Sequence, residues 1–155
     1  MLLGKKKIEC FYPLNKVVLL QAGKEKVLYK PLLNNYVFVY ADDSDQAEIK
    51  ATEGIKTIMY WVNEPAVIKS DEIDMLKHVL NEHDDLHLEK ININLQDQMS
   101  VNEFTKQDEQ SSELAKRFLR VSFPSIGYAL VAEIKAPEGK VINLKPHSQE
   151  RRAVI

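Results

Sequence analysis

Residues 30–68 constrain the fold of this chain most strongly, because they combine a strand, a short helix and a second strand in close succession. Aromatic side chains alternate with smaller residues over residues 36–41, which is the period of a β-strand. A helix over Gln46–Lys50 follows, and residues 56–62 form the next predicted strand. This order predicts a compact α+β unit.

Punctuating residues support these assignments. Ser44 is a favourable N-cap for the short helix, and Gly54 suits the C′ position after it. Trp61 is the large apolar anchor expected of the second strand.

The flanking sequence adds further elements. Residues 7–12 are strand-like, and residues 17–21 and 26–30 form a predicted hairpin whose Gly23 supplies a positive φ. Ser70 is a predicted N-cap for a helix that ends near Glu82, with one apolar face formed by Ile73, Leu76, Val79 and Leu80.

The second half of the chain predicts a separate module. Short alternating runs, with a turn over residues 124–127, indicate several strands between residues 91 and 134 and hence a small β-barrel. We therefore divide the chain into domains over residues 1–82 and 91–135, a polar linker over 83–90 and a basic tail over 136–155.

Charge is unevenly distributed, although the formal net charge is only −2. Residues 1–31 hold seven lysines and two glutamates, residues 41–113 hold 18 acidic and six basic side chains, and residues 114–155 hold eight basic and three acidic ones. Basic ends around an acidic middle allow contact with nucleic acid. A solvated polar surface explains the same pattern.

Patterns typical of enzymes are missing from the sequence. It contains no P-loop, no Gly-x-Gly-x-x-Gly and no Gly-x-Ser-x-Gly. The metal-like cluster consists of three histidines and two aspartates, and we interpret it as a solvated helix end and linker rather than a metal site: His78, His83, His87, Asp84 and Asp85. We expect no catalytic activity, no cofactor and no bound metal.

Compartment follows from composition. Cys10 is the only cysteine, so an internal disulfide cannot form. No apolar run reaches the length of a membrane span, and residues 1–7 are too short and basic for a signal peptide. We expect a cytoplasmic protein.

The order of these pieces resembles the N-terminal domain of NusG-type transcription elongation and antitermination factors. The family pattern Pro-Leu-Phe-Pro-Gly-Tyr-Val-Phe-Val corresponds to residues 31–39, a Gly-Ile pair to residues 54–55, and Gly-Lys-Pro-Ala-x-Ile to residues 63–68. Residues 91–134 resemble the KOW-type barrel that follows in the family. Within them, residues 117–134 are similar to the UpxY-like branch, which is encoded beside capsule and exopolysaccharide loci.

The resemblance implies a truncated NusG-like N-terminal α/β sandwich followed by a small KOW-like β-barrel. It implies a non-enzymatic regulator that docks on the clamp helices of the RNA polymerase β′ subunit and suppresses pausing or termination, at a specific polysaccharide operon. The docking residues would be Leu33, Tyr36 and Phe38. Alternatively, Phe38 and one tyrosine fill the core of the sheet.

Two further sites follow from the resemblance. Lys16, Lys24 and Lys26 would lie near upstream DNA or the non-template strand, or would form a solvated hairpin tip. The barrel would bind a small-subunit ribosomal protein or the termination factor Rho through three residues that equally suit a barrel core: Ile126, Tyr128 and Leu130.

The chain departs from the family pattern in two places. The family's first strand and covering helix precede the segment that starts here at Ile8, and only residues 1–7 stand in that place. Their loss would expose strand edges, which a late start, a truncated gene or self-association would explain. In the barrel, Asn102 and Glu109 replace family glycines, so the loop between them must differ.

Two alternatives to a polymerase-bound regulator stay open. One is a nucleic-acid- or ribosome-binding module that has lost polymerase binding and uses the basic hairpin and the barrel. The other is a degenerate paralogue that folds poorly.

Overall fold

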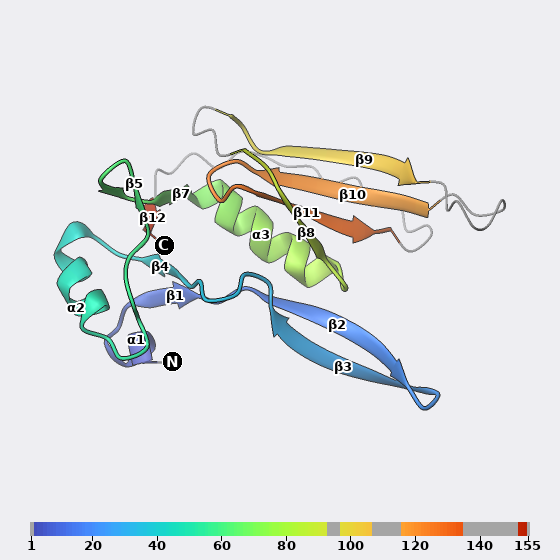
Figure 1. Cartoon of the computed structure of the whole chain (residues 1–155), viewed down its shortest axis with the longest axis horizontal. Helices are drawn as coiled ribbons and strands as arrows, with labels where there is room; N and C mark the ends of the chain where they lie inside the picture. Colours follow the sequence, from blue (N-terminus) through green and yellow to red (C-terminus); the bar gives the residue numbers. More distant parts are fainter. Residues whose placement is uncertain (1, 93–96, 107–115, 135–151, 155) are drawn as a thin grey trace.

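The computed structural model describes residues 2–92, 97–106, 116–134 and 152–154. It confirms the α+β class: Figure 1 shows two sheets, a projecting two-stranded arm and one long helix between them. The elements are α1 (Leu2–Lys5), β1 (Glu9–Phe11), β2 (Leu14–Gln21), β3 (Lys24–Pro31), β4 (Phe38–Tyr40), η1 (Asp43–Asp45), α2 (Gln46–Lys50), β5 (Tyr60–Trp61), β6 (Glu64–Pro65), β7 (Val67–Lys69), α3 (Ser70–Glu82), β8 (His87–Lys90), β9 (Ser100–Lys106), β10 (Lys116–Phe123), β11 (Tyr128–Glu133) and β12 (Arg152–Val154).

The first sheet has the strand order β1-β4-β12-β7. Phe38 and Val39 of β4 are both buried, because successive side chains point to opposite faces and each face meets its own apolar cluster. The strand predicted over residues 36–41 is confirmed over Phe38–Tyr40 only. Its partner β1 has three residues, so the ladder cannot extend further.

Strand β12 lies between β4 and β7 and pairs antiparallel with both. Ala153 is paired with Tyr40 on one side and with Ile68 on the other. Residues from the far end of the chain thus join β4 to β7 in the first sheet. The rest of the predicted tail, residues 136–151 and 155, lies outside the described residues.

The N-terminal residues also contribute to the fold. Leu3 of α1 is buried in a cluster with Ile8, Val39, Ile49 and Ile58. This cluster covers the face of the first sheet on which Val39 lies.

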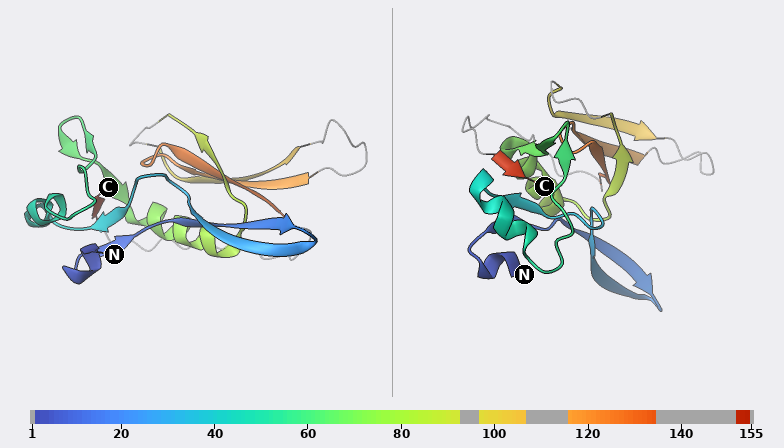
Figure 2. Two further views of the ribbon diagram at one scale, coloured as in Figure 1. Left: turned by 60° about the horizontal axis from the view of Figure 1, so that its bottom comes forward. Right: turned by 60° about the vertical axis from the view of Figure 1, so that its left-hand side comes forward.

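The predicted hairpin is present as β2 and β3, in a register that runs from Leu14↔Pro31 to Gln21↔Lys24. Its turn is shorter than the predicted four residues: Ala22 and Gly23, with φ of 51° and 75°, connect the strands. Two positive φ values match the twist of a tight hairpin. The arm extends away from the rest of the fold in the right-hand view of Figure 2.

The short helix is confirmed as α2 over Gln46–Lys50, and the 3-10 turn η1 precedes it. The Asp42 N–H donates to the Asp45 carboxylate at 2.9 Å and opens the turn η1, so Ser44 is not the N-cap. α2 itself ends at Lys50 with Ala51 as C-cap, and Gly54, with φ of 89°, serves a later turn.

The strand predicted over residues 56–62 shrinks to Tyr60–Trp61, which pairs with Glu64–Pro65. Trp61 is 41% exposed and is not a core anchor, whereas Ile58 is 3% exposed. Val62 and Asn63 form the tight turn between the two short strands, with positive φ values.

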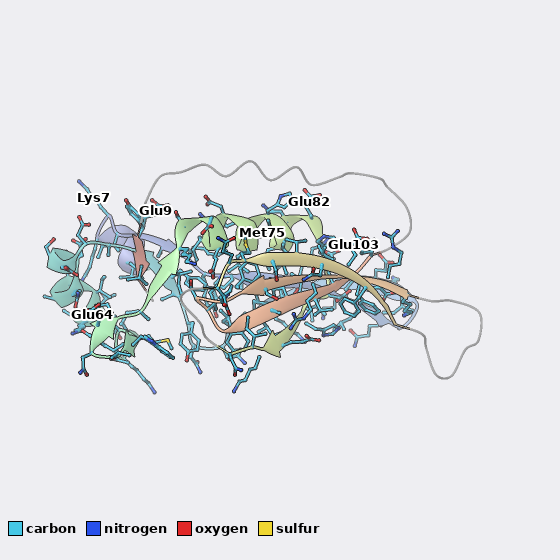
Figure 3. The ribbon with its side chains drawn as sticks, turned by 90° about the horizontal axis from the view of Figure 1, so that it is seen from above. Lys7, Glu9, Glu64, Met75, Glu82 and Glu103 are labelled. Carbon is cyan, nitrogen blue, oxygen red and sulfur yellow. The ribbon has the colours of Figure 1, made fainter. Side chains whose placement is uncertain are left out.

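Helix α3 ends at Glu82, as predicted, and buries its predicted apolar face. Lys69 rather than Ser70 is the N-cap, and Ser70 is the first helical residue. In Figure 3, Met75 lies on α3 beside the second sheet, and Glu82 marks the helix end. No helix in the described part of the chain is long and apolar enough to cross a membrane.

The second sheet is antiparallel, with the order β8-β11-β10-β9. The predicted linker and the predicted barrel both differ from the structure. Half of the linker predicted over residues 83–90 is strand β8, which pairs with β11. The described strands form an open sheet in which β8 and β9 are the outer strands, not a closed barrel. Because α3 and the first half cover the apolar face, the sheet buries it without curling on itself.

One core cluster joins the two halves. It contains Leu33 and Phe38 from the first half, Leu76 from α3, and Val121 and Leu130 from the second sheet. The turn predicted over residues 124–127 is confirmed: the Gly127 N–H donates to the Phe123 carbonyl at 3.0 Å, and Gly127 has a φ of 77°.

Candidate partner-docking pocket

A pocket of about 260 Å³ lies where the first half of the chain meets the second sheet. Leu33, Tyr36 and Phe38 line it from the segment that leads into β4. Ile126 and Tyr128 line it from the β10–β11 connection. The structure thus brings together residues about 90 positions apart, which the sequence assigned to two different sites.

The pocket is mainly apolar, with one cation at its edge. Met59 and Ile91 complete its wall, and the exposed Lys90 is the last residue of β8. The Ile91 N–H donates to the Gly127 carbonyl at 3.0 Å and extends the pairing of β8 with β11 by one residue at this point. An apolar pocket with aromatic walls and few polar groups is suited to receive apolar side chains of a partner.

The predicted polymerase-binding residues differ in accessibility. Tyr36 is 41% exposed and forms the rim, whereas Leu33 and Phe38 are 6% and 2% exposed. Phe38 stacks on Phe11 with ring centroids 6.0 Å apart. Leu33 and Phe38 therefore form the floor of the pocket and part of the core, and Tyr36 presents the accessible ring.

The residues predicted to bind a partner through the barrel also differ in accessibility. Ile126 and Tyr128 are half-buried in the pocket wall, and Leu130 is 1% exposed in the core. The reading of Leu130 as barrel core fits its burial, and it offers no surface to a partner.

The lysines predicted to bind nucleic acid do not form one surface. Lys16 pairs with Asp84 at 3.0 Å, and this carboxylate raises the pKa of Lys16. The register pairs Lys16 with Tyr29, and Lys24 and Lys26 with Gln21 and Leu19. Because neighbouring positions alternate between faces, Lys16 lies on the face of the arm opposite to Lys24 and Lys26.

Residues 84–86 hold the root of the arm, a role that the sequence did not reveal. The Val18 N–H donates to the Asp85 carboxylate at 3.1 Å, and the Asp85 N–H donates to the Lys16 carbonyl at 2.8 Å. The Asn15 side chain exchanges two hydrogen bonds with the backbone of Leu86, at 2.9 and 3.1 Å. The one sequence signal for this contact is the acidic pair Asp84 and Asp85, which follows the end of α3.

Asp84 and Asp85, the two aspartates of the metal-like cluster, make this structural contact with the arm. In the described residues, no group of three or more histidine, cysteine or acidic side chains could hold a metal ion. Burial lowers the pKa of His83, so this ring favours its neutral form.

Glu72 positions one wall of the pocket, and the sequence did not single it out. Its carboxylate is fully buried and accepts the Ser125 N–H at 3.2 Å and the Ser125 hydroxyl at 2.8 Å. Burial raises the pKa of Glu72, and the bonds from Ser125 oppose that shift. Because Ser125 precedes Ile126 in the turn, this contact fixes the pocket wall against α3.

One of three comparisons with known proteins agrees with the resemblance. No curated protein and no solved structure gives a significant match to this chain. One family model does match, and it covers residues 1–77, including Leu33, Tyr36 and Phe38. That family is described as transcription termination factor NusG, and the match supports a NusG-type transcription factor.

Proposed function

We propose that this chain is a non-enzymatic, cytoplasmic regulator of transcription elongation or antitermination that docks on the clamp helices of the RNA polymerase β′ subunit. The observation that carries the proposal is the pocket itself. The residues to which the resemblance gives polymerase contact line one apolar pocket, and Tyr36 remains accessible at its rim.

The pocket suits a helical partner in size and chemistry. An amphipathic helix docks by placing a few apolar side chains in a groove, and aromatic anchors carry much of the energy. A volume of about 260 Å³ accommodates one or two such side chains. Clamp docking would hold the polymerase closed and thereby suppress pausing or termination.

Other parts of the proposal follow from the resemblance alone. Action at one polysaccharide operon is proposed because the sequence of residues 117–134 is similar to that of the UpxY-like branch. A small-subunit ribosomal protein or Rho would contact the second sheet through Ile126 and Tyr128. Because these two residues line the same pocket as Tyr36, we expect such a partner to compete with the clamp helices.

Transcription in vitro tests the function. Purified chain added to elongating RNA polymerase should shorten a defined pause or increase readthrough of a terminator. The Tyr36→Ala variant should lose this effect, and Tyr12→Ala should keep it, because Tyr12 is similarly exposed at 40% but does not line the pocket. Equal effects of wild type and Tyr36→Ala would count against the proposal.

A further inference from the structure

The arm formed by β2 and β3 has one occupied edge and one open edge. The β2 edge is held at its root by residues 84–86, through the hydrogen bonds of Asn15, Lys16 and Val18. Strand β3 has eight residues and, in the part of the chain that the structure describes, β2 is its only partner strand. An unpaired strand edge is a template for another strand.

The two faces of β3 differ in chemistry. The pairs Val18↔Val27 and Lys16↔Tyr29 place Val27 and Tyr29 on one face, where they are 46% and 65% exposed. Leu20 belongs to the same face of the arm and is 78% exposed. The exposed Glu25 also belongs to this face, near the tip of the arm. The other face of β3 carries the exposed Lys24, Lys26 and Lys30 and the half-buried Leu28. The strand therefore presents a mainly basic face and a mainly apolar face. Figure 2 shows the projecting arm to which this strand belongs.

We propose that this edge of β3 binds an extended peptide segment that alternates acidic and apolar residues. The partner would add a third strand to the arm, with carboxylates opposite the lysines and apolar side chains beside Val27 and Tyr29. Main-chain hydrogen bonds give affinity in strand addition, and cross-strand pairs of opposite charge give specificity. A third strand also stabilises a two-stranded ribbon, which is marginal in water.

A second copy of this chain is disfavoured at the edge, because the two antiparallel registers that pair the most residues of β3 place lysine opposite lysine. In the antiparallel register centred on Val27, Lys24 lies opposite Lys30, and in the register centred on Leu28, Lys26 lies opposite Lys30. Like charges directly opposite each other destabilise a sheet. Lysines on an edge strand do prevent such self-pairing, but that role leaves the exposed Leu20, Val27 and Tyr29 unexplained.

A peptide titration of the full chain tests the proposal. The probe is a fluorescent eight-residue peptide that alternates glutamate with valine or threonine, and its control has the same composition with the glutamates grouped at one end. We expect saturable binding of the alternating peptide only, with slower amide exchange in β3. Equal binding of both peptides, or no saturable binding, would overturn the proposal.

Reversing the charge of the three lysines on β3 tests the predicted charge pairing more directly than the peptide titration does. The variant Lys24→Glu/Lys26→Glu/Lys30→Glu should bind the acidic peptide about tenfold more weakly and should acquire binding to an alternating lysine–valine peptide. The matched control Lys5→Glu/Lys7→Glu/Lys56→Glu changes the net charge equally at exposed positions outside the arm and should bind as wild type. Thermal melts establish that each variant is folded.

A single-stranded oligonucleotide is titrated in parallel. If the oligonucleotide binds and the arm variant loses that binding, while the peptide does not bind, the lysines serve phosphate contact and the strand proposal is wrong. Loss of clamp docking in Tyr36→Ala is independent of this result, because Tyr36 lies in the pocket and not on the arm.

Discussion

Glu72 of α3 accepts both the backbone N–H and the hydroxyl of Ser125, at 3.2 and 2.8 Å, and thereby joins the long helix to the turn that carries Ile126. The carboxylate is fully buried. Two donors from one residue compensate part of its lost hydration. The shape of the docking pocket thus depends on a contact between residues 53 positions apart in the sequence.

Removing the hydroxyl should destabilise this contact. We expect Ser125→Ala to lower the free energy of unfolding by about 1–3 kcal/mol, because a buried carboxylate loses a donor. Ser44→Ala, at an exposed position in η1, should change it by less than about 0.5 kcal/mol. Urea unfolding followed by circular dichroism measures both. Equal stability of Ser125→Ala and wild type would show that the hydroxyl bond contributes nothing.

The raised pKa of Glu72 predicts a pH dependence of stability. Burial raises this pKa above its ordinary value of 4.5, so the folded protein holds the proton more tightly than the unfolded chain does. The contribution of Glu72 to the free energy of unfolding therefore falls as pH rises from 4.5 through the raised folded pKa, and it is constant above that.

The variant Glu72→Gln isolates this contribution, because it leaves nearby Lys69 and Asp71, which also act on this pKa, and His83 in place. The free energy of unfolding of wild type minus that of Glu72→Gln should decrease between pH 4.5 and the raised folded pKa. Urea titrations at several pH values measure the difference. A difference that does not change with pH would contradict the assignment.

The root of the arm depends on Asn15. Asn15→Ala removes both hydrogen bonds to the Leu86 backbone, and we expect a loss of about 1–3 kcal/mol in the free energy of unfolding. Amide exchange in β2 should accelerate, whereas exchange in the two four-stranded sheets should change less. Asn102→Ala, at an exposed position in β9, is the matched control. Unchanged exchange in β2 would show that the arm is held by other contacts.

Strand β12 should stabilise the first sheet. A variant that ends at residue 151 would leave β4 without β12 on one side and would leave β7 unpaired. We expect its free energy of unfolding to fall by about 2 kcal/mol or more, because several ladder hydrogen bonds of about 1 kcal/mol each are lost. Amide exchange should accelerate in β4 and β7. Protection equal to that of the full chain would contradict the pairing.

Local patterns predicted the local elements well. The apolar spacing of Ile73, Leu76 and Val79 gave α3 and its end, and alternation with a glycine turn gave the β2–β3 arm. Both depend on neighbours along the chain. The capping error at Ser44 is small by comparison, since the observed N-cap, Asp42, lies only two residues earlier.

Long-range contacts explain what the sequence could not reveal. The polar segment that contains β8 is a strand only because β11 offers it an edge, and β12 pairs with strands more than 80 positions away. Likewise, Phe38 and Leu130 are core residues because the second sheet covers the first half. Tyr36 and Phe38, two positions apart, therefore differ in accessibility although the sequence gives them the same pattern.

The most direct test of the central claim is the affinity of the purified chain for an isolated fragment of the RNA polymerase β′ clamp helices. We predict saturable binding that Tyr36→Ala weakens at least tenfold, as expected for an aromatic anchor, and that the equally exposed Tyr12→Ala leaves within twofold of wild type. If the folded wild type does not bind the clamp helices, or if both variants bind as wild type does, the pocket is not the polymerase-docking site.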